Sequence, residues 1–177
     1  FSVTMWYHFA FMAVSIAMFG MTVGAVIVYL FPKFFNQSRA KNQLALSSLL
    51  FAISIIASFL VYLTIPFTTQ TSTISFLPNL AALSLIYLIV SIPFVFSGIC
   101  VCLILTKFTQ QVSRLYAADL IGAATGSILL VYLLNIVSGP TAVVVTAFFA
   151  GLGVIFFSNE AGLKKIKWAA VLLTIIF

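Results

Sequence analysis

Ionisable side chains are scarce in this sequence. Among 177 residues there are only two acidic residues, eight basic residues and one histidine. General acid and base catalysis needs several such groups held close together, and the chain has no pair of carboxylates suited to that work. We therefore expect this chain to contain no catalytic residue of its own and to bind no cofactor.

Sequence motifs that bind nucleotides or metals are also missing. The chain has no phosphate-binding loop, no G-x-G-x-x-G, no G-x-S-x-G and no H-E-x-x-H. Its two cysteines, Cys100 and Cys102, lie in one apolar run, where a helix would point them to different faces. We interpret them as packing thiols and expect no metal site.

Apolar residues are in large excess. They make up 64% of the chain, whereas an ordinary soluble domain is roughly 45–50% apolar. A soluble fold of this size has too little polar surface to cover such an excess, but a bilayer can act as its apolar solvent. The composition therefore predicts an all-α, polytopic transmembrane helix bundle, forming a single domain over residues 1–177 with the lipid bilayer as its main partner.

Five charge-free apolar runs are long enough for helices that cross a bilayer, which takes about 20 residues. A sixth run is still apolar at Phe177, and because the sequence also begins at Phe1 we expect both ends to continue in a longer chain. Between two of the runs, Gly139 is expected to adopt a left-handed helix cap, with Pro140 in the first turn of the next helix. The predicted helices are five complete ones near 9–30, 44–65, 80–106, 115–137 and 139–157, and a truncated sixth near 168–177.

All basic residues fall in the first, third and fifth connections between these runs. They are Lys33, Arg39, Lys41, Lys107, Arg114, Lys164, Lys165 and Lys167. The positive-inside rule places such connections in the cytoplasm. We therefore expect an integral protein of the cell membrane with residue 1 outside. The basic residues are few and flank helices, so no nucleic-acid partner is expected.

One acid, Asp119, lies within a predicted span. Intramembrane acids usually face protein or water, so Asp119 is either a proton or cation site in a transport path or a structural acid. In the structural interpretation the positive helix N-terminus favours the carboxylate, and Arg114, Tyr116 or a neighbouring helix satisfies it. We favour the structural interpretation, because a transporter usually has more than one buried charge.

Two G-x-x-x-G pairs predict close helix packing. Gly122 and Gly126 share a helix face with Asp119, and Gly20 and Gly24 form a second pair on the first helix. Small residues at this spacing let another helix approach closely. We expect the two faces to dock on each other or on other helices, including those of other membrane subunits or of a second copy.

Two more residues within or beside the predicted spans could carry a function. His8 follows Trp6 and Tyr7 at the start of the first helix. It could be a proton relay or an axial ligand, but we favour an interfacial aromatic belt. Pro93 lies within the third helix, where a kink can mark a gate or a cavity, although we favour plain packing. We expect Ser91 or Ser97 to satisfy the carbonyl that this proline leaves free.

The segment from Arg114 to Gly126 reads Leu-Tyr-x-x-Asp-Leu-x-Gly-Ala-x-x-Gly after its arginine. It resembles a motif of membrane-spanning spermidine-synthase-like proteins, in which a multi-helix membrane region is fused to a cytoplasmic aminopropyltransferase-type domain. The opening residues 1–11 and the region of Gly20 and Gly24 also look like that family. The resemblance implies a downstream domain that binds a polyamine and a donor of the decarboxylated S-adenosylmethionine type. No catalytic residue can be carried over to these 177 residues.

Three functions follow from these observations. The first is the membrane region of a spermidine-synthase-like protein that anchors or partners a cytoplasmic catalytic domain. The second is a small-molecule or ion transporter that uses Asp119. The third is a structural subunit of a larger membrane complex. Any aminopropyltransferase activity would belong to sequence outside this chain, so the sequence leaves open whether the protein is an enzyme.

Overall fold

A computed structural model describes residues 2–64 and 76–176. For residues 2–10, 76–83, 164, 165, 173, 175 and 176 it describes the backbone alone. Every regular element in these ranges is a helix. The elements are α1 (Ser2–Leu30), η1 (Gln37–Arg39), α2 (Ala40–Thr64), α3 (Phe76–Lys107), η3 (Thr109–Gln111), α4 (Val112–Ile136), α5 (Gly139–Glu160) and α6 (Lys164–Ile176).

Five of these helices are long and apolar enough to cross a membrane. The candidate spans are 11–30, 37–64, 84–107, 109–136 and 139–160. The sixth helix, α6, has only 13 residues, fewer than the roughly 20 that a crossing needs. The predicted all-α, membrane-embedded class is therefore confirmed, with five helices that meet the length and composition for a span.

Most helices extend further than the charge-free runs predicted. The first begins at Ser2, the second at Ala40, the third at Phe76, the fourth at Val112 and the sixth at Lys164, and the fifth continues to Glu160. Polar residues at these ends keep helical hydrogen bonds while their side chains reach water, so a helix need not stop where the hydrocarbon stops. The predicted boundaries were wrong by three to seven residues at these ends.

The expected left-handed cap at Gly139 is also wrong. Gly139 is the first residue of α5, and Ser138 before it is extended, with its hydroxyl 2.9 Å from that of Thr141. Within the described residues the only left-handed glycine is Gly162, with a φ of 69°, in the turn between α5 and α6. There the amide of Leu163 donates to the carbonyl of Ser158. The turn between α5 and α6 therefore uses a left-handed glycine, whereas the turn between α4 and α5 does not.

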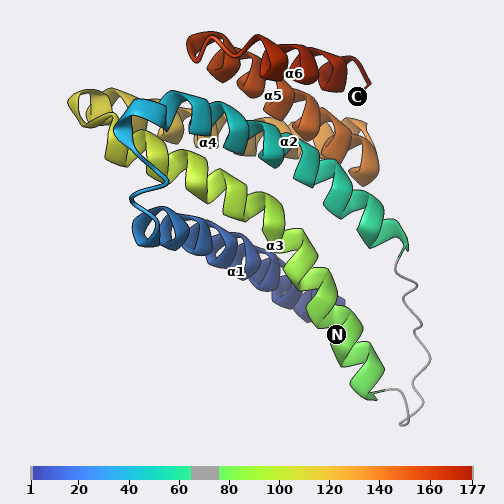
Figure 1. The fold of residues 1–177 in the computed structure, drawn as a ribbon. Helices are drawn as coiled ribbons and strands as arrows, with labels where there is room; N and C mark the ends of the chain where they lie inside the picture. The colour runs from blue at the N-terminus through green and yellow to red at the C-terminus, as the bar shows by residue number, and fades with distance from the viewer. Residues whose placement is uncertain (1, 65–75, 177) are drawn as a thin grey trace.

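The helices form a row rather than a closed ring. Each helix of the row contacts the next, in the order α1, α3, α2, α5 and α6. The main contacts of α4 with other long helices are short stretches against α3 and α5. Figure 1 shows α1 along one side of α3, and α6 on the far side of α5. The row places α2 and α3 at its centre and leaves α4 largely outside it.

Many of the buried residues of the bundle are small, and many large apolar side chains face outward. One cluster joins Ala52, Val154 and Ala170 of α2, α5 and α6. Serines are buried as well, among them Ser47, Ser48, Ser54, Ser58, Ser91 and Ser158, whereas many Phe, Leu, Ile and Tyr side chains are exposed. Small residues at helix contacts with lipid-facing large residues are the usual arrangement of membrane bundles.

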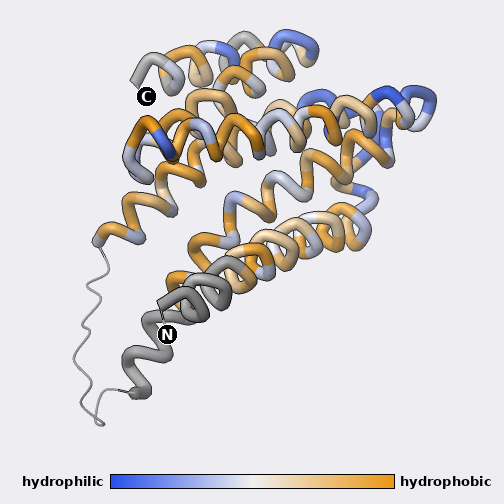
Figure 2. Tube along the Cα trace, turned by 180° about the vertical axis from the view of Figure 1, so that it is seen from behind, coloured by the Kyte–Doolittle hydropathy of each residue, from blue (hydrophilic) through white to orange (hydrophobic). Residues whose placement is uncertain are grey.

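Hydrophilic residues collect at one end of the bundle (Figure 2). At this end the Gln37 side-chain amide donates to the carbonyl of Lys107, which ties the first connection to the end of α3. Lys41 lies 3.8 Å from Glu160, and both side chains are exposed. An ion pair this exposed contributes little to stability, but it shows that the basic end of α2 and the end of α5 lie at the same level.

Candidate functional site

Asp119 lies on the most exposed helix of the bundle. No residue of α4 is buried, and Asp119, Arg114 and Tyr116 are all exposed. None of these three side chains forms a hydrogen bond or an ion pair with any described residue. We expected Arg114 or Tyr116 to satisfy Asp119, but the structure does not bring either side chain to it. The carboxylate is therefore accessible to a donor from another helix or domain.

The Gly122 and Gly126 pair borders a groove between α4 and α5. The groove has a volume of about 440 Å³, and Thr125 and Phe149 also line it. A Cβ atom added at either glycine would meet no described atom within 4 Å. This pair therefore packs against no helix of the described chain, and the expected docking of the two glycine faces on each other does not occur.

The Gly20 and Gly24 pair lies directly against α3. A Cβ on Gly20 would lie 2.7 Å from the Cβ of Phe94, and one on Gly24 would collide with the carbonyl oxygen of Val95. In return, Gly98 of α3 meets the backbone of Met21. Backbone contacts this close are possible only because these positions lack side chains.

Pro93 lies inside α3, which changes direction along its length (Figure 1). A proline cannot donate to the carbonyl four residues earlier, and it bends the helix. The orphaned carbonyl here belongs to Ile89, and the Ser58 hydroxyl of α2 donates to it at 2.9 Å. Our expectation of Ser91 or Ser97 as the donor was wrong, since Ser91 donates to Leu88 instead.

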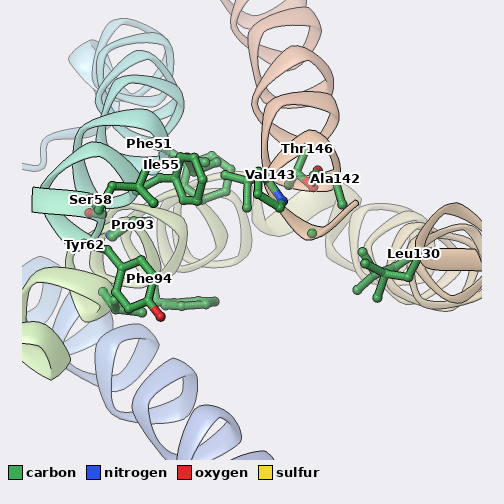
Figure 3. A pocket seen from close by; sticks show the side chains of 16 residues that line it. Phe51, Ile55, Ser58, Tyr62, Pro93, Phe94, Leu130, Ala142, Val143 and Thr146 are labelled. Carbon is green, nitrogen blue, oxygen red and sulfur yellow. Dashed lines mark hydrogen bonds between the residues drawn. The ribbon is translucent and has the colours of Figure 1, made fainter. Parts of the chain in front are cut away.

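A large cavity adjoins Pro93 and Ser58. It has a volume of about 680 Å³ and lies between α2, α3, α4 and α5. Figure 3 shows Phe51, Ile55, Tyr62 and Phe94 on one side, with Val143 and Thr146 on another. Asp119 is not part of its wall. The sequence offered a cavity at Pro93 as one alternative, but plain packing was favoured and the residues that line the cavity were not identified.

Comparison with protein-family models, with curated proteins and with solved structures found no match. The function therefore has to be inferred from the residues and their arrangement.

The remaining candidates do not form a reactive centre with these residues. The backbone of His8 belongs to α1, but its side chain lies outside the described ones. Cys100 and Cys102 are free and partly buried on α3. The Cys102 sulfur lies 4.0 Å from the carbonyl oxygen of Ala25 and packs on the apolar cluster between α1 and α3. Within the described ranges, no three His, Cys, Asp or Glu residues gather where they could hold a metal.

Two sites remain for function. One is the exposed face of α4, with a carboxylate, two glycines and a groove, which can accept a protein neighbour. The other is the apolar cavity at Pro93, which can accept an apolar ligand. Among the described residues, neither site brings together groups that would make or break a covalent bond.

Proposed function

We propose that this chain is the membrane-embedded region of a spermidine-synthase-like protein, which anchors or partners a cytoplasmic aminopropyltransferase-type domain. The observation that carries the proposal is the position of the segment 114–126. It lies on α4, which has no buried residue. The spacing of Asp119, Gly122 and Gly126 therefore serves no packing within the described chain, and a contact with another domain or helix accounts for it.

The energetics of Asp119 also favour a neighbour on α4. Asp119 is seven residues into the helix, which places it about 10 Å from the helix start. A carboxylate at such a depth lies near the boundary of the hydrocarbon, where exposure to lipid is costly. A partner that offers a hydrogen-bond donor or a cation there would remove this cost, and the adjacent glycines would let it approach closely.

The charge distribution supports a cytoplasmic location for the partner domain. Basic residues lie in the connection 31–39, on either side of the connection 108–111 at Lys107 and Arg114, and at the start of α6. Connections flanked by basic residues stay on the cytoplasmic side of the cell membrane. Residue 1 is then outside. The start of α4, with Arg114 and the motif, faces the compartment in which the catalytic domain would lie.

A structural subunit of a larger membrane complex is the second candidate, and the open face of α4 favours it equally. The ion-transport hypothesis has no such support, because the wall of the cavity at Pro93 is apolar and does not include Asp119. A transport path needs polar groups that replace the hydration of the ion.

The proposal is tested on the native protein. An antibody against residues 31–41 would isolate it from its own membranes, and intact mass, peptide sequencing and aminopropyl transfer from decarboxylated S-adenosylmethionine to putrescine would be measured. We expect transferase activity, either in a polypeptide longer than this chain or in a tightly bound partner. Isolation of these residues with no such domain and no transfer would overturn the proposal and leave the structural subunit.

Asp119→Asn separates a contact role from a role in folding. Because Asp119 is exposed and has no partner among the described residues, we expect the substitution to change the unfolding free energy of the isolated chain by less than about 0.5 kcal/mol. The same substitution should weaken co-purification of the partner several-fold. Loss of the isolated fold, or unchanged partner binding, would contradict the assignment of Asp119 to an external contact.

A further inference from the structure

We propose that the cavity between α2, α3, α4 and α5 binds one acyl chain of a membrane phospholipid. The cavity has a volume of about 680 Å³, within the range of roughly 300–1,000 Å³ typical of small-ligand sites. Its wall is built mainly of aromatic and aliphatic side chains, including Phe51, Phe59 and Phe94. In a bilayer, hydrocarbon is the solvent that reaches such a wall.

Apart from the Tyr62 hydroxyl at one end, the hydroxyl groups on the wall already have hydrogen-bond partners. The Ser58 hydroxyl donates to the carbonyl of Ile89, and the Thr146 hydroxyl donates to that of Ala142. A buried water needs about two to four polar partners, which these groups do not supply. The cavity therefore favours an apolar occupant over water or a hydrated ion.

The length of the cavity matches one leaflet of the bilayer. Its stripe on α2 runs from Phe51 to Leu63, which at about 1.5 Å per residue is roughly 18 Å. Half of the roughly 30 Å hydrocarbon core is about the same length. An extended acyl chain that begins at the membrane surface would fill this depth, whereas a helix that crosses the whole bilayer would project beyond it.

One end of the cavity reaches the helix ends opposite the basic connections. There the wall includes Tyr62, near the end of α2 at Thr64, and Gly139 and Pro140 at the turn between α4 and α5. The Tyr62 hydroxyl has no hydrogen-bond partner among the described residues, and its side chain is 52% exposed. Tyrosines favour the level of lipid headgroups, so Tyr62 marks where the polar end of the lipid lies.

The bend at Pro93 and the loose packing of α4 explain why the space exists. Pro93 is on the wall, and a proline bend turns one half of a helix away from its neighbour. Because α4 contacts α3 and α5 only over short stretches, its side chains on the wall, Leu130 and Leu134, leave the cavity partly open. The cavity is thus reached from the lipid, between helices, rather than from water alone.

The test uses the chain in nanodiscs made with a phospholipid that carries a diazirine on its acyl chain. After illumination, mass spectrometry locates the adducts. We expect them to concentrate on Phe51, Ile55 and Phe94, above the level on Met18, which is exposed on α1. Leu134→Trp, which fills the cavity from α4, should lower cavity labelling several-fold, and so should Val143→Trp from α5.

The matched control is Val131→Trp, which lies on the same helix but outside the cavity wall. Leu134 and Val131 are 51% and 66% exposed, so neither substitution threatens the fold. Val131→Trp should leave labelling unchanged. Equal labelling of the cavity and of Met18, equal effects of the two α4 variants, or co-purification of an isoprenoid in place of phospholipid would each overturn the proposal. These outcomes do not depend on whether a catalytic domain is present.

Discussion

Gly24→Ala is expected to lower the unfolding free energy by about 1–3 kcal/mol, the usual cost of forcing atoms into a well-packed contact. The new methyl group would collide with the carbonyl oxygen of Val95 and lie 2.8 Å from the amide nitrogen of Ile99. Both atoms belong to the α3 backbone and cannot turn aside as a flexible side chain would. Helix α1 must therefore move away from α3 along their shared face.

The same substitution at Gly126 is the matched control. Both glycines lie inside long helices, and an alanine is intrinsically better in a helix by about 1 kcal/mol. A Cβ at Gly126 meets no described atom within 4 Å, so Gly126→Ala should be neutral or slightly stabilising in the isolated chain. Pulse proteolysis in mild detergent measures both. A Gly24→Ala variant as stable as Gly126→Ala would refute the packing of α1 on α3.

Cys102 offers a local readout of the same change. Its sulfur lies 4.0 Å from Ala25 of α1, and it packs on the cluster that includes Val28 and Leu103. In a Cys100→Ala background, separation of α1 from α3 should speed the reaction of Cys102 with maleimide. This distinguishes loss of the α1 contact from a general loss of fold, because α2, α5 and α6 pack together elsewhere.

Ser58→Ala is expected to cost about 1–3 kcal/mol, because it leaves the part-buried carbonyl of Ile89 without its donor. The Ile89 carbonyl has lost its helical donor to Pro93 and receives the Ser58 hydroxyl at 2.9 Å instead. Ser54→Ala is the control. Ser54 is equally buried on α2, but its hydroxyl donates to Phe51 of its own helix, whose carbonyl keeps its helical partner.

A double-mutant cycle with Pro93→Ala tests the cause. An alanine at position 93 restores an amide that can donate to Ile89, so the loss of Ser58 should then cost less. We expect the two substitutions to be coupled by about 0.5–3 kcal/mol, as residues that share one hydrogen-bond network are. Strict additivity of the two substitutions would show that Ser58 does not compensate for the proline.

The class of the fold could be predicted because it depends on composition and run length. A helix satisfies its backbone hydrogen bonds within one segment and is therefore stable in hydrocarbon. Long apolar runs such as 139–157 were thus enough to predict an all-α membrane fold. The helix ends were misplaced, as at Ala40, because a charge-free run gives the length of the segment within the hydrocarbon core and not the full length of the helix. Lys41 and its neighbours continue α2 beyond it.

Which helices meet could not be predicted in the same way. The two G-x-x-x-G pairs look alike in sequence, yet Gly24 packs on α3 and Gly126 faces a groove. The difference depends on contacts between residues more than 70 positions apart, and the bond from Ser58 to Ile89 joins residues 31 positions apart. A single sequence shows that a helix face is suited to close packing, but it does not show which helix packs against that face.

Thiol accessibility tests most directly whether a bilayer takes up the apolar surface of these helices. In a chain with Cys100 and Cys102 replaced by alanine, single cysteines at Asn36, Gln110, Asn159 and Ser138 would be treated with an impermeant maleimide in intact cells. We predict that Ser138→Cys reacts at once and that the other three react only after permeabilisation. The reverse pattern would invert the orientation, and full labelling of all four in a soluble, monomeric protein would contradict the account.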